Sequence, residues 1–182
     1  MPPKLQNRLK SGLWIVLPLI LLLFISNRIA DNPLPMDSGT YVLSANGLTL
    51  EEIKGNVTFN EVEVVSKNGH LLNVLTINFD DAGSKEGLNM EFLISVRSDD
   101  EPISEGNYYV NRYISGFVSE FNGVFGYANL DTQGEEPYFS KSGHLQITKR
   151  SDDIIQGKME VTLEDVRGKR LQLQGSFSAE QE

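Results

Sequence analysis

Apolar and polar residues alternate along much of this chain, behind a single apolar run near its start. Residues 88–96 carry apolar side chains at every second position and polar or charged ones at most positions between. Because successive side chains of a β-strand point to opposite faces, this pattern predicts a half-buried strand. Residues 155–163 and 171–177 repeat it on either side of a turn, Asp165 to Lys169, which contains Gly168. These two segments are predicted to form a hairpin.

Other strands are predicted where the alternation is shorter. Residues 75–79 mark a strand that ends at Asp80, and Leu145 and Ile147 begin another after Gly143. Less regular strands are expected at residues 41–44, 57–65, 108–113 and 117–128, and polar, glycine-bearing connections at 80–87, 98–106, 131–143 and 150–153. Within residues 57–65 the apolar positions change face, which would require a bulge near Asn60 or two separate strands.

Eight or nine strands without any helical periodicity predict an all-β domain. The expected architecture is a single antiparallel sandwich or a flattened barrel, preceded by one N-terminal hydrophobic helix. This domain is expected to occupy residues 39–182. It follows a short linker, residues 31–38, which Pro33 and Pro35 stiffen.

The first 30 residues are predicted to direct the chain to a membrane. Lys4, Arg8 and Lys10 precede the apolar run from Leu13 to Ile25, which is the order of an export signal with its amino terminus in the cytoplasm. The run is shorter than the about 20 helical residues that span a bilayer. No suitable pair of small residues for signal peptidase follows it, however. A single-pass signal-anchor in the cell membrane is therefore favoured over a cleaved signal peptide, which would leave a secreted or periplasmic domain.

Charge and composition narrow the choice of partners. The net charge is -9, with 16 basic and 25 acidic residues, and the first 30 residues contain basic residues but no acidic ones. The domain itself is therefore strongly acidic and would repel the phosphates of nucleic acid, which we exclude as a partner. The chain has 0 cysteines, which excludes disulfides, thiolate nucleophiles and sulfur-ligated metals.

No residue pattern predicts a catalytic, cofactor-binding or metal-binding site. His70 and His144 each follow a glycine without a partner motif, so we expect surface histidines, with His144 pointing to solvent. Acidic clusters recur in the connections at Asp80-Asp81, Asp99-Asp100-Glu101, Glu135-Glu136 and Asp152-Asp153. They lack the spacing of a calcium loop, so solvated turns are favoured over a calcium site.

Aromatic residues are densest in the second half of the chain. The group consists of Tyr108, Tyr109, Tyr113, Phe117, Phe121, Phe125, Tyr127, Tyr138 and Phe139. It could line a surface for a ligand or partner. The alternative, that half of these side chains fill the core, is favoured because strands are rich in aromatic residues.

The final part of the chain also resembles a known group of proteins. The segments are Ser142 to Thr148, Ile155-x-Gly157-x-Met159-x-Val161, Gly168, and Gly175-x-Phe177, together with Gly106-x-Tyr108. They are similar to the closing hairpins of small uncharacterised exported β-sandwich domains of Bacteroidetes lipoproteins. The resemblance covers the second half of the chain and implies a fold and an exported location, without an activity or site residues. This chain departs from the pattern because it lacks a lipid-accepting cysteine.

These observations lead to three functional hypotheses. The first is a non-enzymatic binding or structural module on the extracytoplasmic side of a membrane, which it contacts through its N-terminal segment. The alternative is a carrier that holds an apolar ligand inside a lipocalin-like barrel. A carboxylate or metal-assisted hydrolase is least favoured, because it needs two acidic residues that converge in a cleft.

Overall fold

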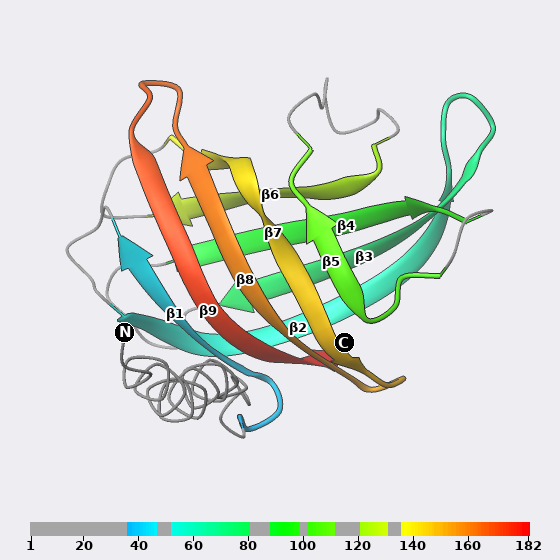
Figure 1. Ribbon diagram of the computed structural model, residues 1–182, viewed down its shortest axis with the longest axis horizontal. Coiled ribbons are helices and arrows are strands. Elements are labelled where there is room, and N and C mark those ends of the chain that lie inside the picture. The colour runs from blue at the N-terminus through cyan, green and yellow to red at the C-terminus, as the bar shows by residue number, and fades with distance from the viewer. Residues whose placement is uncertain (1–35, 47–51, 81–87, 99–101, 112–120, 131–135) are drawn as a thin grey trace, which may run out of the picture. The chain divides into compact units, whose positions relative to one another are not determined.

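The structure is a computed structural model that describes residues 36–46, 52–80, 88–98, 102–111, 121–130 and 136–182 (Figure 1). The predicted N-terminal helix, residues 1–30, and most of the predicted linker lie outside these residues. In the part of the chain that is described, the structure contains no helix long and apolar enough to span a membrane.

Nine strands make up the described part of the domain. They are β1 (Thr40–Asn46), β2 (Glu52–Val65), β3 (Leu71–Asp80), β4 (Leu88–Arg97), β5 (Gly106–Tyr109), β6 (Gly123–Leu130), β7 (Tyr138–Arg150), β8 (Ile154–Glu164) and β9 (Arg170–Gln181). The three segments with strict alternation correspond to β4, β8 and β9, and a turn at Asp165 to Lys169 joins β8 to β9. These predictions are confirmed.

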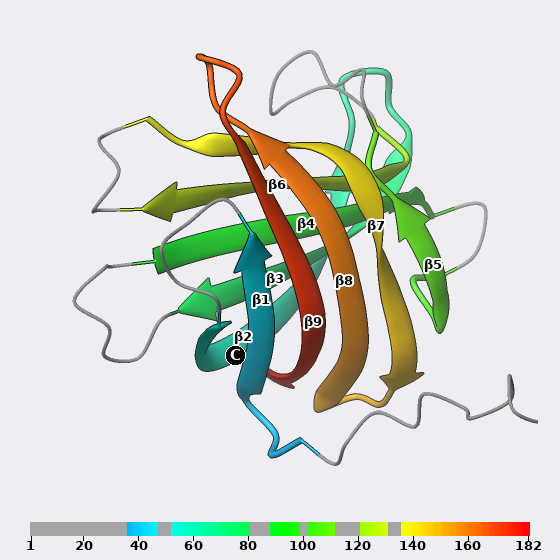
Figure 2. The same cartoon turned by 60° about the vertical axis from the view of Figure 1, so that its left-hand side comes forward.

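The sheet closes on itself to form a barrel. Hydrogen bonding follows the order β7-β6-β4-β3-β2-β1-β9-β8, and β8 pairs with β7 to complete the circle. All neighbours around this circle are antiparallel, and β5 is an extra strand that pairs with β7. Figures 1 and 2 show β1, β9, β8 and β7 crossing over β2, β3, β4 and β6, so the barrel is flattened. The all-β prediction is confirmed, and a barrel is the correct alternative.

Strand β2 differs from its prediction. It pairs with β3 in one unbroken register from Asn56–Asp80 to Val65–Leu71, so the expected bulge near Asn60, or a division into two strands, is wrong. Phe59 is the last residue of β2 that is buried in the core. The apolar pattern changes face beyond Phe59 because the barrel interior no longer dictates which face is apolar.

Strand β7 begins earlier than its prediction. It starts at Tyr138, so the expected connection up to Gly143 is wrong. A register shift against β8 lies between Ser140 and Ser142, and Gly143 has a φ of 116°. A side chain at Gly143 would place a Cβ only 2.0 Å from the carbonyl oxygen of Glu160. This irregularity interrupts the alternation from which strands are predicted.

Four aromatic rings meet inside the barrel around Phe79. The Phe79 ring centroid lies 5.2 Å from that of Tyr41, 5.9 Å from Phe92 and 5.6 Å from Phe177, all edge-to-face. Each such pair stabilises the fold by about 0.5–1.5 kcal/mol beyond the burial of its surface. Because Phe79 and Phe92 come from the adjacent strands β3 and β4, and Tyr41 and Phe177 from the adjacent strands β1 and β9, the cluster packs one pair of strands against the other across the barrel.

Two of these rings lie directly over strand glycines. Phe92 pairs across the strands with Gly126, and Phe177 pairs with Gly157. A Cβ at Gly126 would lie 2.2 Å from the Phe92 ring, and one at Gly157 would lie 2.5 Å from the Phe177 ring. The glycines therefore make the space that the two rings occupy.

Candidate binding surfaces

The barrel interior, where a carrier would hold its ligand, is filled by the protein's own side chains. Leu75, Ile77, Phe79, Phe92 and Ile94 each have 0% of their surface exposed. A cavity that admits water would leave exposed surface on the residues lining it. A ligand pocket of about 300 Å³ or more would leave much more. These five side chains of β3 and β4 are therefore packed on all sides by protein atoms.

One end of the core is covered by the connection between β4 and β5. Ile103 in this connection is 1% exposed and packs into the core. The Tyr108 hydroxyl holds the connection in place, since it accepts a hydrogen bond from the amide of Ser104 and donates one to its carbonyl oxygen, both at 2.8 Å. The core is therefore closed to solvent at Ile103.

An ion pair lies next to this connection. Arg150, at the end of β7, pairs with Glu61 of β2, and its backbone amide donates a 3.4 Å hydrogen bond to Glu105. The Arg150 Nη1 atom is buried without a hydrogen-bond partner in the described part of the chain. Both side chains remain about a quarter to a third exposed, at 24% and 30%. The pair therefore joins β7 to β2 where β2 leaves the core.

An aromatic face covers the outside of β6 and β7. Phe125 stacks on Phe139 with ring centroids 6.2 Å apart, and Phe121 contacts Phe125 edge-on at 6.5 Å. Tyr127 pairs across the strands with Phe139 on one side and with Glu91 of β4 on the other. All five side chains are half-buried. Burial raises the pKa of Glu91, and burial and then the Glu91 charge raise the pKa of Tyr127.

The predicted aromatic group therefore lies mainly outside the core. Tyr138 is buried in it and Tyr108 packs against its edge, whereas Tyr109 is 66% exposed. Phe121, Phe125, Tyr127 and Phe139 form the aromatic face, and Tyr113 and Phe117 lie outside the described residues. Of the seven members that the structure describes, only Tyr138 is fully buried, so among them fewer than half fill the core. The buried rings come instead from isolated aromatic residues, such as Phe79 and Phe177, in separate strands.

The two histidines lie apart from each other on the surface. His144 is half-buried on the outer face of β7, where its ring centroid lies 5.8 Å from that of Tyr109. His70 is exposed in the turn between β2 and β3, and its Nδ1 atom lies 3.2 Å from the Arg97 guanidinium. Neither lies in a cluster of potential metal ligands among the described residues.

The acidic clusters are only partly described. Asp152 and Asp153 are exposed in the turn between β7 and β8, while residues 81, 99–101 and 135 lie outside the described residues. Within the described ranges, no three His, Asp or Glu side chains gather as they would around a metal ion.

Exposed apolar side chains gather at the far end of the β2–β3 hairpin. They are Val62 (45% exposed), Val64 (38%), Val65 (69%) and Leu71 (47%). Together with Lys67 and His70 of the turn, we call these residues the hairpin tip. Figure 1 shows this turn projecting past the neighbouring strands. The change of face along β2 is the sequence signal that marks this surface, because it shows where β2 leaves the core.

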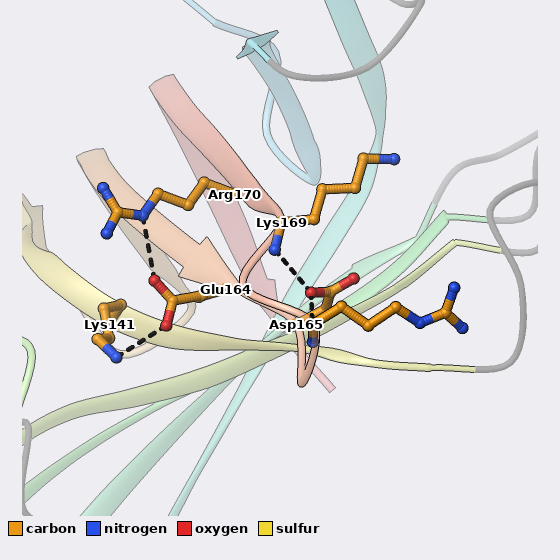
Figure 3. A network of polar contacts seen from close by, with 6 residues as sticks. Lys141, Glu164, Asp165, Lys169 and Arg170 are labelled. Atoms are coloured by element: carbon orange, nitrogen blue, oxygen red, sulfur yellow. Dashed lines mark hydrogen bonds and ion pairs between the residues drawn. The ribbon is translucent and has the colours of Figure 1, made fainter.

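The turn between β8 and β9 carries charged residues instead. Glu164 accepts hydrogen bonds from Lys141 at 2.8 Å and from Arg170 at 3.1 Å, and Asp165 accepts one from the Lys169 amide (Figure 3). The two cations lower the pKa of Glu164 through these hydrogen bonds. Arg167 in the same turn pairs with Glu136 at 3.0 Å. Ion pairs thus cover this turn.

Comparison with known proteins finds no match: no protein-family model, no curated protein and no solved structure matches the chain.

Proposed function

We propose that this protein is a non-enzymatic binding or structural module, held at the extracytoplasmic face of a cell membrane by its N-terminal segment. The observation that carries the proposal is the filled interior, in which Leu75, Phe79 and Phe92 have no exposed surface. A barrel filled in this way is a rigid scaffold, and contacts with partners then fall to its outer surface. The membrane location is supported by Lys4, Arg8 and Lys10 ahead of the apolar run.

The alternative is an apolar-ligand carrier, with which the closed barrel is compatible because barrels of eight strands can hold one small ligand. The two proposals differ in what the interior contains. Native mass spectrometry of the full chain, extracted in mild detergent, should give the mass of the bare protein. A stoichiometric apolar molecule that survives detergent exchange would overturn the proposal in favour of the carrier.

A core variant provides the positive control for this measurement. Phe79→Ala removes the ring at the centre of the aromatic cluster and opens a cavity, because the surrounding structure relaxes only partially. The variant should gain binding of a small apolar probe such as benzene, while the wild-type chain does not bind it. Equal binding by both chains would show that the wild-type interior is already open.

The location is tested separately. Before protease treatment, the full chain should be found in the membrane fraction. Protease added to cells whose outer envelope is permeabilised, but whose cytoplasmic membrane is intact, should then digest the domain. Protection of the domain until the cytoplasmic membrane is broken would overturn the proposed topology. A domain found in the soluble fraction, with a new amino terminus between Ser26 and Ser38, would replace the anchor by a cleaved signal.

A further inference from the structure

We propose that the hairpin tip of β2–β3 is a second membrane contact, which docks on an anionic bilayer surface. This inference rests on the proposed membrane location. It adds that the domain lies against the lipid through Val62, Val64, Val65 and Leu71 rather than standing clear of it.

The first support is the apolar surface itself. Val65 and Leu71 form the last cross-strand pair before the turn, and Val62 and Val64 precede them on the other face of the strand. All four side chains are exposed. The tip projects and carries apolar side chains on both faces of the hairpin. A lipid bilayer can surround both faces, whereas a flat protein surface would cover only one.

The second support is the charge around these side chains. Lys67 is exposed at the turn, and Arg97 lies beside His70 at 3.2 Å. Of the neighbouring acidic residues, Glu61 pairs with Arg150. Glu63 stays at the tip, where it accepts a 2.9 Å hydrogen bond from Ser98, whose amide donates to the Leu71 carbonyl. Lys67 and Arg97 are thus two basic residues beside one acidic residue among the described residues of this region. Basic residues beside exposed apolar ones favour anionic lipid headgroups. Residues 99–101 are acidic and lie outside the described residues. The experiment therefore compares neutral with anionic vesicles, which tests the effect of charge on docking.

The third support is reach. The Val57 amide donates to the carbonyl of Gly39 where the chain enters the barrel, and β2 continues from there to Val65, which is about 26 Å at 3.3 Å per residue. Residues 26–38 can span up to about 45 Å when fully extended. A membrane-anchored chain therefore keeps the bilayer within reach of the tip at a high effective concentration.

The experiment reads the N-terminal segment and the tip independently in one molecule. The chain has 0 cysteines and 1 tryptophan, Trp14, so Asn68→Cys gives a unique site in the exposed turn for an environment-sensitive fluorophore. The full chain is reconstituted in vesicles of phosphatidylcholine, with or without phosphatidylglycerol, that contain spin-labelled quencher lipids. Quenching of Trp14 reports insertion of the N-terminal segment, and quenching of the fluorophore reports docking of the tip.

We expect Trp14 to be quenched in both vesicles, and the tip fluorophore to be blue-shifted and quenched in the anionic vesicles. Because one basic side chain near an anionic surface changes binding about fivefold, Lys67→Ala should reduce the docking equilibrium about fivefold. Val65→Ser with Leu71→Ser should abolish tip quenching and leave Trp14 unchanged. These exposed positions lie outside the core, so the variants should fold.

The matched control is Val166→Cys, which carries the same fluorophore in the β8–β9 turn, where Val166 is 74% exposed. This probe should stay in water. A water-like tip probe in anionic vesicles, or equal quenching in neutral and anionic vesicles, overturns the inference even if Trp14 is inserted. A blue shift that needs no vesicles and grows with protein concentration assigns the tip to a second copy of the chain and also overturns it. A solvent-exposed Trp14 overturns the proposed anchor alone.

Discussion

The β2–β3 and β8–β9 hairpins use the same turn but surround it with different side chains. In each, the amide of the first turn residue, Ser66 or Asp165, donates to the carbonyl of the fifth, and the fourth residue is a glycine with a φ of 83°. The last cross-strand pair before the turn is Val65–Leu71 in one hairpin and Glu164–Arg170 in the other.

This difference shows that the backbone and the surface of a hairpin are specified separately. A three-residue loop with a left-handed glycine suits the twist of paired strands whatever the flanking residues are. The flanking side chains decide only what the end of the hairpin contacts. Ion pairs keep the β8–β9 turn in water, whereas the apolar pairs at the hairpin tip leave surface for a partner.

The largest losses in the free energy of unfolding are expected in the core, where a strand from each hairpin contributes an aromatic ring. Phe79 of β3 and Phe177 of β9 contact each other in the core, with ring centroids 5.6 Å apart. Phe79→Ala and Phe177→Ala should each lower the free energy of unfolding by about 3–5 kcal/mol. Val65→Ala at the hairpin tip should change it by less than about 0.5 kcal/mol. Chemical denaturation of the three variants measures these changes. Similar losses for the Val65 and Phe79 variants would show that the hairpin tip contributes to stability as much as the core does.

The turns themselves should respond equally. A Cβ at Gly69 or Gly168 would meet nothing within 4 Å, so only the left-handed backbone opposes a substitution. Gly69→Ala and Gly168→Ala should therefore each lower the free energy of unfolding by about 1–2 kcal/mol. Chemical denaturation of the two variants measures these losses. A loss of unfolding free energy at one glycine that is more than twice the loss at the other would show that the two turns are not equivalent.

The strands were predictable where one face of each strand is buried over its whole length. Residues 155–163 and 171–177 alternate strictly because every second side chain, such as Val161 and Leu173, enters the core. The alternation fails at Gly143, where a register shift moves the strand by a residue, and beyond Phe59, where β2 leaves the core. The pairing of β9 with β1, which the closed barrel requires, joins segments far apart in the sequence, and periodicity does not encode such pairings.

The surfaces were harder to predict than the fold. Aromatic residues close together in sequence were expected to divide between core and surface, but Phe125 and Phe139 stack on the outside, while single rings from distant strands fill the centre. A short-range pattern cannot tell which aromatic residues meet in space. The hairpin tip is visible in the sequence only as a change of face along β2, which predicts a bulge near Asn60 or two separate strands instead of a surface.

Replacing the apolar pair of the β2–β3 hairpin by the charged pair of the β8–β9 hairpin should abolish membrane docking without changing the fold. Val65→Glu with Leu71→Arg gives the β2–β3 hairpin the pair found at the base of the β8–β9 turn. Because cross-strand pairs contribute about 0.2–1 kcal/mol each, the free energy of unfolding should change by no more than about 1 kcal/mol. The fluorophore at Asn68→Cys should then remain in water with anionic vesicles. If the fluorophore were still quenched in a folded double variant, docking would not depend on the apolar pair Val65–Leu71.

The smallest expected effect is electrostatic and confined to the β8–β9 hairpin. Because Lys141 and Arg170 lower the pKa of Glu164 in the folded state, its contribution to stability is present above the pKa of the unfolded chain. It is lost as the pH falls through the lowered folded value. Glu164→Gln should therefore lower the thermal midpoint at pH 7 by a small amount, and the difference from wild type should shrink as the pH falls below about 4.

Thermal denaturation across this pH range measures the difference, and the partners of Glu164 supply its control. In a background with Lys141→Gln and Arg170→Gln, the carboxylate has lost both hydrogen-bond donors. Glu164→Gln should then produce no pH-dependent change in the midpoint. Because the Lys141 and Arg170 side chains are exposed and salt screens their charges, the effect in the wild-type background should also decrease as ionic strength rises. A difference from wild type that persists at low pH would mean that Glu164 stabilises the hairpin through packing instead of its charge.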